Sequence, residues 1–502
     1  NKNKMKNYFI IFLVHTTFIF SQDIKIPVDT IITTYHKTLI KGKEIKYTAE
    51  AGTQPVWDNN GKPIASLFYT YYKRNLSKDD KTKESHRPII ISFNGGPGSG
   101  SLWMHVGYTG PKVLKIDDEG FPTQPYGVKT NPHSIIDTAD IVFVCPVNTG
   151  YSRMLPNEDG EYTDREKFFG INADIKYLAS WINTFITRKN RWESPKYIIG
   201  ESYGGTRVMG LSYELQSRHW IYLNGVIMVS PADYKLFEEG DAVNSSLHLP
   251  YYSATAWYHD ALTHELQSKD LEEILPEVEN FTINQLIPAI AKGGFISDLE
   301  KNKIAEQYSQ YSGLSKNFIL SHNLDVPNNS FWKELLREKN GFTVGRLDSR
   351  YRGIDKRLAG SSPDSNIELN SWNHSFTPAI NYYLRNELNF KTDIKYNVFG
   401  PVHPWDRGND NTRENLRKAM AQNPFLKVLI QSGYYDGATN YFQAKYTMWQ
   451  VDPSGRMKDR FYFEGYRSGH MMYLRAEDLK KSNDDLRDFI KNSSTQGKPA
   501  KY

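Results

Sequence analysis

The chain has 502 residues, of which 39% are hydrophobic, 14% aromatic and 24% charged. This composition provides enough apolar material for a large core and excludes a disordered or collagen-like chain. Lysines and arginines number 62 against 57 aspartates and glutamates, a net charge of +5 that is not gathered into basic runs, so a nucleic-acid-binding protein is disfavoured. The single cysteine, Cys145, excludes a disulfide within the chain. Because it lies in an apolar run, we expect it to be a buried side chain.

The first 21 residues have the layout of a secretory signal peptide. Lys2, Lys4 and Lys6 precede an apolar stretch at residues 8–20, and a polar segment begins at Ser21. The apolar stretch is shorter than the roughly 20 residues that cross a bilayer, and no later segment approaches that length. We therefore expect cleavage near Ser21 and export to the periplasm or the extracellular space, without stable membrane insertion.

The pattern of apolar residues predicts an α/β fold. Residues 24–72 alternate in short runs, and Asn-Asn-Gly at 59–61 predicts a hairpin turn in an antiparallel sheet. Apolar residues with helical spacing lie between residues 171 and 185. Short continuous apolar runs, typical of strands buried on both faces, occupy residues 89–93, 141–145, 197–199, 226–229 and 428–430. The last strand-like elements are expected at 427–431 and 460–463. We expect a mostly parallel central sheet with helices on both faces.

The alternation of strands and helices stops near residue 237 and resumes near residue 398. The intervening residues are helix-like, for example at 304–311 and 331–339, and predict a largely helical cap inserted into the sheet domain. The predicted organisation is a signal peptide at 1–21, the first part of the core at 22–236, the cap at 237–397, the second part of the core at 398–491 and a flexible tail at 492–502.

Residues 200–204 read Gly-Glu-Ser-Tyr-Gly and match the pattern G-x-S-x-G. They follow the apolar run at 197–199 and precede a segment at 206–216 that can form a helix, so they occupy the strand-to-helix turn of a nucleophile elbow. We therefore predict Ser202 as a nucleophile, at a helix N-terminus that favours negative charge. The alternative is a tight glycine turn with an incidental serine.

A serine nucleophile needs a base, and the base needs an orienting group. In this type of fold the chain order is nucleophile, acid, histidine. Asp436 and His470 each follow a predicted strand, at the sheet edge where sites form. We predict that His470 takes the proton of Ser202 and that Asp436 fixes the histidine tautomer. The alternatives are a turn-forming aspartate and a solvated loop histidine.

Residues 94–101 read Asn-Gly-Gly-Pro-Gly-Ser-Gly-Ser and directly follow a predicted strand. We predict that the backbone amides of Gly96 and Tyr203 form an oxyanion hole, the alternative being a purely structural glycine loop. A phosphate-binding loop is excluded because no Lys-Ser or Lys-Thr follows at the Walker spacing and G-x-G-x-x-G is absent. With neither paired cysteines nor H-E-x-x-H, no metal or other cofactor is predicted.

The chain resembles the serine carboxypeptidase family, α/β-hydrolases that remove C-terminal residues from peptides. The resemblance rests on four motifs in family order: N-G-G-P-G at 94–98, G-E-S-Y-G-G at 200–205, G-Y-Y-D at 433–436 and G-H-M at 469–471. It implies peptide substrates, the triad Ser202, Asp436 and His470, and an oxyanion hole at Gly96 and Tyr203. It also implies that Asn94 and a protonated Glu201 bind the substrate's terminal carboxylate, which favours activity at acid pH.

Two positions depart from the eukaryotic members of this family. Ser92 stands where they carry a tryptophan, and residues 103–110 contain no acid to pair with Glu201, so burial alone must raise the pKa of Glu201. His105, Lys112 and Arg207 are alternative carboxylate-binding residues. The missing disulfides fit a bacterial-type member. An esterase or acyltransferase with the same triad, and a binding protein that lost the chemistry, remain open alternatives.

Overall fold

The computed structural model describes residues 24–77, 80, 83–232, 241–408, 411–494, 497 and 499–501. The predicted signal peptide at residues 1–21 lies outside the described residues. Within these ranges, no helix is both long enough and apolar enough to cross a membrane.

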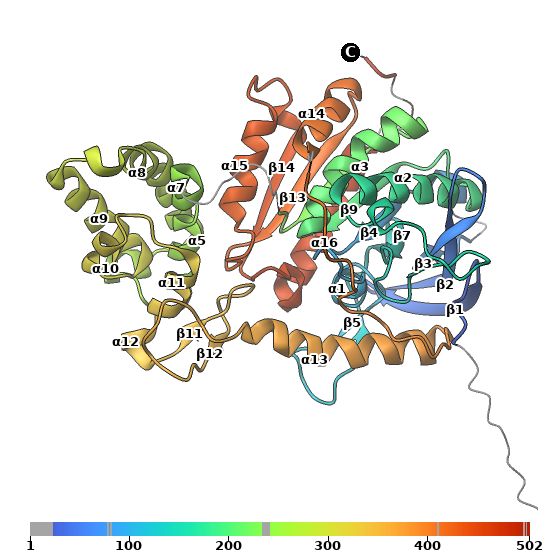
Figure 1. The fold of residues 1–502 in the computed structure, drawn as a ribbon, viewed down its shortest axis with the longest axis horizontal. Coiled ribbons are helices and arrows are strands. Elements are labelled where there is room, and N and C mark those ends of the chain that lie inside the picture. Colours follow the sequence, from blue (N-terminus) through green and yellow to red (C-terminus); the bar gives the residue numbers. More distant parts are fainter. Residues whose placement is uncertain are drawn as a thin grey trace, which may run out of the picture.

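A ten-stranded sheet forms the centre of the molecule (Figure 1). Its order is β1-β2-β3-β7-β4-β9-β10-β13-β14, with β8 paired to β3. Strands β1, β2, β3 and β7 pair antiparallel, whereas all pairs from β7 to β14 are parallel, so the predicted mostly parallel sheet is confirmed. The strands are β1 (Ile31–Ile40), β2 (Lys43–Trp57), β3 (Pro63–Arg74), β4 (Ile89–Phe93), β7 (Asp140–Val144), β8 (Arg153–Met154), β9 (Lys196–Glu201), β10 (Gly225–Val229), β13 (Lys427–Gly433) and β14 (Phe461–Tyr466). A separate small pair is formed by β5 (Lys112–Leu114) and β6 (Val128–Thr130).

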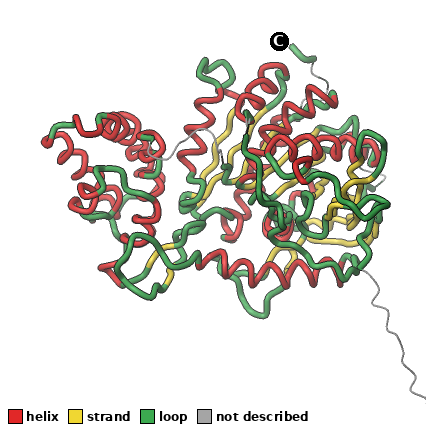
Figure 2. The backbone as a smooth tube through the Cα atoms, viewed as in Figure 1, coloured by secondary structure: helices red, strands yellow, loops and turns green. Residues whose placement is uncertain are grey.

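Helices cover both faces of the sheet (Figure 2). One face packs against α2 (Ile171–Arg188), α3 (Tyr203–His219), α14 (Thr412–Gln422) and α15 (Tyr441–Val451). The other packs against α1 (Leu102–Gly107), α13 (Ile367–Tyr382) and α16 (Ala476–Ser493). Side chains of β4 and β7 alternate between the two apolar clusters, as the period of two in a strand requires. The apolar positions predicted between residues 171 and 185 are all buried in α2.

Between β10 and β13 the chain leaves the sheet and forms a group of helices with an apolar cluster of its own (Figure 1). Within this cluster Tyr252 stacks on Phe331 with ring centroids 3.9 Å apart. The helical stretch expected at 331–339 is divided between α11 (Asn328–Glu334) and α12 (Arg337–Asn340). The division into core and cap at residues 237 and 397 stays a prediction. The elements are α4 (Ala242–Ser246), α5 (Leu249–Tyr258), α6 (His264–Gln267), α7 (Leu271–Phe281), α8 (Ile287–Ala291), α9 (Asp298–Ser312), α10 (Lys316–Ser321), α11 (Asn328–Glu334), α12 (Arg337–Asn340), β11 (Thr343–Val344) and β12 (Arg352–Gly353).

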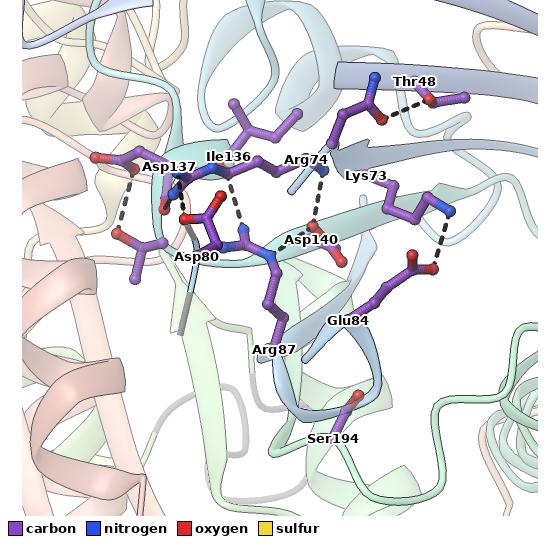
Figure 3. A network of polar contacts seen from close by, with 12 residues as sticks. Thr48, Lys73, Arg74, Asp80, Glu84, Arg87, Ile136, Asp137, Asp140 and Ser194 are labelled. Carbon is purple, nitrogen blue, oxygen red and sulfur yellow. Dashed lines mark hydrogen bonds and ion pairs between the residues drawn. The ribbon is translucent and has the colours of Figure 1, made fainter. Parts of the chain in front are cut away.

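A buried ionic network holds the strand starts at the amino-terminal edge of the parallel sheet (Figure 3). Asp140, the first residue of β7, is fully buried. Its carboxylate accepts hydrogen bonds from the backbone amide of Arg74 (3.0 Å), from Nε of Arg87 (3.1 Å) and from Nη1 of Arg191 (2.6 Å). A buried carboxylate needs such partners to offset its desolvation. The network lies at the edge opposite the strand ends that carry the predicted catalytic residues.

Candidate active site

The turn after β9 holds Ser202 in the geometry of a nucleophile elbow. Strand β9 ends at Glu201 and α3 begins at Tyr203, so Ser202 alone makes the turn, with φ +59° and ψ −124°. A positive φ is strained for a residue with a side chain, and such strain persists only where the surroundings impose it. A Cβ on Gly200 would run into the carbonyl of Gly204, and one on Gly205 would lie 2.6 Å from Cβ of Pro231. Gly200 and Gly205 are therefore steric requirements of this turn.

Asp436 and His470 meet at the carboxyl ends of β13 and β14. Nδ1 of His470 lies 2.7 Å from Oδ2 of Asp436, and both side chains are buried. The other carboxylate oxygen, Oδ1, accepts hydrogen bonds from the backbone amides of Ala438 (2.8 Å) and Thr439 (3.1 Å). The hydroxyl of Thr439 lies 2.7 Å from Oδ2. Because a carboxylate can only accept here, Nδ1 carries the proton and Nε2 is left to act as a base.

Electrostatic interactions favour the ionised forms of both residues, the carboxylate of Asp436 and the imidazolium of His470. Burial pushes the pKa of His470 down, but the charge and hydrogen bond of Asp436 outweigh burial and hold that pKa above its ordinary value. Burial likewise raises the pKa of Asp436, but His470 and the Thr439 hydrogen bonds outweigh it and leave the pKa below its ordinary value. The carboxylate therefore stabilises the imidazolium that forms when His470 takes a proton.

Ser202 and His470 line the same cavity, which has a volume of about 250 Å³. Among the described residues, no hydrogen bond links Oγ of Ser202 to Nε2 of His470. Catalytic hydrogen bonds are often long in the absence of substrate and shorten when it binds. The structure thus brings the three predicted triad residues to one site, with the acid and base already in contact.

The glycine loop after β4 packs directly on the elbow. A Cβ on Gly95 would lie 2.6 Å from the backbone nitrogen of Tyr203 and 2.9 Å from Cβ of Ser202. Gly96 has φ +110°, a conformation that residues with side chains rarely adopt, and it lines the cavity. Tyr203 is the first residue of α3. Both amides predicted to form the oxyanion hole therefore lie beside Ser202, and their role stays a prediction.

Glu201 is a fully desolvated acid beside the nucleophile. One of its carboxyl oxygens accepts a hydrogen bond from Nδ2 of Asn94, and the other accepts one from the hydroxyl of Tyr473 (2.6 Å). Burial, the largest effect, raises the pKa of Glu201 to about 7 despite the nearby His470 and these two hydrogen bonds. The expectation that burial would raise this pKa without a partner acid agrees with that value.

The three alternative carboxylate-binding residues do not line the cavity. His105 is buried against the hydroxyl of Tyr72 (2.6 Å), and burial lowers its pKa to about 3. Lys112 pairs with Glu387 at 3.2 Å. Arg207 is buried in an ion pair with Asp174 (2.6 Å), and its Nη1 donates to the carbonyl of Asn94 (2.6 Å), so it supports the glycine loop from behind. Cys145 is buried as expected, and burial raises the pKa of its thiol to about 11.

Sequence reasoning missed three residues of the site. Thr439 lies three positions after Asp436, and Tyr473 lies three after His470, so proximity to the motifs was the only available signal for both. Arg346 lines the cavity from the hairpin of β11 and β12, far from any motif, and nothing in the sequence marks it.

Comparison with known proteins agrees with this geometry. The family described as serine carboxypeptidase matches residues 45–462. The chain belongs to the serine carboxypeptidase family. Its fold is that of the α/β-hydrolases, as expected. It resembles Kex1, a prohormone-processing carboxypeptidase from Saccharomyces cerevisiae, with a TM-score of 0.53 and 14% identity over 89% of this chain and 91% of the other.

Curated relatives of the family match only part of the chain. Serine carboxypeptidase-like 36 of Arabidopsis thaliana is 28% identical over 178 residues, 34% of this chain and 33% of the relative. Vitellogenic carboxypeptidase of Aedes aegypti is 29% identical over 171 residues, 33% of this chain and 32% of the relative. The chain thus spans about a third of the length of these relatives.

Proposed function

We propose that this protein is a secreted serine carboxypeptidase that hydrolyses the last peptide bond of its substrates through an acyl-enzyme on Ser202. Membership of the serine carboxypeptidase family supports the reaction class. The observation that carries the proposal is the 2.7 Å contact between Nδ1 of His470 and Oδ2 of Asp436, in the cavity that Ser202 also lines. A Ser-His-Asp triad with an oxyanion hole is the machinery of acyl transfer.

Each step has a residue of this chain assigned to it. Oγ of Ser202 attacks the scissile carbonyl while Nε2 of His470 takes its proton, and the imidazolium then gives that proton to the leaving amine. The amides of Gly96 and Tyr203 stabilise the negative oxygen of the tetrahedral intermediate. Water, activated by His470, then hydrolyses the ester on Ser202 and restores the enzyme. Asp436 keeps His470 in the productive tautomer throughout.

Asn94 and Glu201 account for the preference for a chain end. Glu201 is buried beside Ser202, and its neutral form can donate a hydrogen bond to a substrate carboxylate. Nδ2 of Asn94 has two hydrogens, of which the contact with Glu201 uses one. Glu201 lines the catalytic cavity, whereas Asn94 is fully buried and does not line it, so Glu201 is the group of the two that a substrate carboxylate reaches directly.

Two finer assignments accompany this proposal. The layout of residues 1–21 supports export, and the single cysteine supports a bacterial-type member. The relatives named above come from a plant and an insect, and neither bears on the second assignment. N-terminal sequencing of the mature protein tests the first, and a mature chain that still begins at Met5 or earlier contradicts it.

The decisive comparison uses a peptide with a free C-terminus and its amidated twin across the pH range. Below about pH 7 Glu201 is neutral and donates to the carboxylate, whereas above that pH its charge repels the carboxylate. We expect the ratio of kcat/KM for free acid over amide to be about tenfold or more at acid pH, the size of one charge-assisted hydrogen bond, and to fall as the pH rises through 7. Since His470 serves both peptides, its titration cancels in the ratio.

Glu201→Gln provides the matched control, because glutamine keeps the size of the side chain and cannot ionise. In this variant the ratio should no longer change between pH 5 and pH 8. A wild-type ratio near one at every pH, together with rapid hydrolysis of simple esters, contradicts the carboxypeptidase assignment and supports an esterase or acyltransferase.

A further inference from the structure

The hairpin of β11 and β12 supplies a short strap, residues 345–349, that ties together the loops of the catalytic acid and base. The backbone amide of His470 donates to the carbonyl of Leu347 (2.6 Å), and the amide of Gly437 donates to the carbonyl of Arg346 (2.9 Å). The amide of Ser349 in turn donates to the carbonyl of Tyr435 (3.0 Å). The backbone of Arg346 is therefore fixed between the two loops that carry the triad.

The side chain of Arg346 contrasts with its anchored backbone. It is exposed, and it makes no hydrogen bond or ion pair with any described residue. Arginines 350 and 352 of the same hairpin region do have partners: Arg350 pairs with Asp348 (2.6 Å), and Arg352 lies over the ring of Phe342. Arg346 therefore stands at a fixed place in the chain with its guanidinium available.

Arg346 is part of the lining of the catalytic cavity. Arg346 lines it together with Ser202 and His470, and its charge is a small effect that opposes the raised pKa of His470. Among the described residues that line the cavity, the other ionisable side chains are Glu201 and His470, so Arg346 is the one that stays charged at every working pH. The rest of the lining is apolar or neutral, and its large apolar side chains include Trp103, Leu369, Phe399 and Met471.

The positive charge of Arg346 works against the rise that Asp436 and Glu201 produce in the pKa of His470, and it also lowers the pKa of the buried Glu368. It disfavours the imidazolium that His470 must become. An anion bound to Arg346 would remove this effect and would gain a hydrogen-bonded contact, since the guanidinium fork matches a carboxylate in geometry. The substrate is the natural source of that anion, because Arg346 lines the same cavity as Ser202, which the substrate must reach.

We infer that Arg346 binds a carboxylate of the peptide substrate in this cavity and thereby determines specificity. The inference rests on the proposed function and deepens it. The carboxylate has two possible sources, the C-terminal main-chain group or the side chain of an Asp or Glu next to the scissile bond. Both present the same chemistry to the guanidinium, and the experiment separates them.

Two ratios of kcat/KM test the inference, each measured in the wild type, in Arg346→Gln and in the control Arg352→Gln. The first compares a free C-terminus with its amide, and the second compares Asp or Glu with Asn or Gln beside the scissile bond. Arg346→Gln should lower one of the two ratios by about 10- to 100-fold, as loss of a charge-assisted pair predicts, while Arg352→Gln leaves both unchanged. Arg346→Lys should restore part of the loss.

A fall in the first ratio identifies the main-chain carboxylate, and a fall in the second identifies the acidic side chain. If both ratios in Arg346→Gln equal those of the wild type, the inference is overturned. Using ratios cancels any general change in His470, so a merely structural role of Arg346 would not produce either result.

A binding measurement separates failure of this inference from failure of the proposed function. If the wild type cleaves no peptide, a second experiment uses N-benzoylglycine, which has a free carboxylate, and its amide. It measures how well each compound slows the reaction of Ser202 with a fluorophosphonate. If the acid protects Ser202 at a concentration at least tenfold lower than the amide needs, and Arg346→Gln abolishes this difference, the result supports carboxylate binding even though the protease assignment has failed. Equal protection by the acid in both proteins overturns it.

Discussion

Ser202→Ala is expected to lower kcat by about 10⁴- to 10⁶-fold while leaving the fold intact, the range seen when a triad nucleophile is removed. The reason is that no other described hydroxyl in the cavity combines the elbow position with the base His470. Turnover of a peptide substrate, measured together with far-ultraviolet circular dichroism and the melting temperature, checks both parts of the expectation.

Ser99→Ala is the matched control for this variant. Ser99 lines the same cavity, but its hydroxyl oxygen accepts a hydrogen bond from Nε1 of Trp103 (2.8 Å) and so supports the wall of the site. Loss of one such hydrogen bond costs about 1 kcal/mol, so activity should fall by no more than about tenfold. Activity of Ser202→Ala within tenfold of the wild type would rule out the nucleophile assignment.

Asp436→Asn is expected to lower kcat by about 10⁴-fold without a large loss of stability. Oδ1 of Asp436 accepts from the amides of Ala438 and Thr439, so the carbonyl oxygen of an asparagine would occupy that place. Its NH₂ group would then face Nδ1 of His470 and donate to it. This forces the proton of the imidazole onto Nε2, the atom that must accept the proton of Ser202.

Thr439→Val is the milder variant with which Asp436→Asn is compared. It removes the hydroxyl next to Oδ2 but leaves the carboxylate, so the tautomer of His470 is retained and the loss should be about tenfold. Steady-state kinetics of both variants between pH 5 and pH 9 distinguish a wrong tautomer, which no pH repairs, from a shifted pKa. An Asp436→Asn enzyme that regains wild-type kcat at any pH in this range contradicts the tautomer argument.

The sheet could be predicted from sequence because its strands carry a strong local signal. The run at 89–93 coincides with β4, and the run at 141–145 differs from β7 by one residue at each end. Strands buried on both faces need continuous apolar residues, and few other structures do. The helical stretch at 331–339 is divided in the structure at Leu335 and Leu336, a tertiary effect that helical spacing does not reveal.

The site could be predicted only where local geometry dictates the residues. Gly200 and Gly205 are required by the close packing around Ser202, so this turn is visible as a motif. Arg346 has no such signal, because backbone hydrogen bonds carry it to Gly437 and His470, and any residue type can make them. A single sequence therefore does not reveal positions that are fixed by main-chain contacts between distant loops.

The most direct test of the account is covalent labelling with a fluorophosphonate, located by mass spectrometry of the digested protein. We expect one adduct, on the peptide that contains Ser202, formed at least about a hundredfold more slowly in His470→Ala because general-base assistance is lost. An adduct on another serine, or labelling of Ser202 at an equal rate in His470→Ala, would show that the three side chains do not act as one catalytic unit.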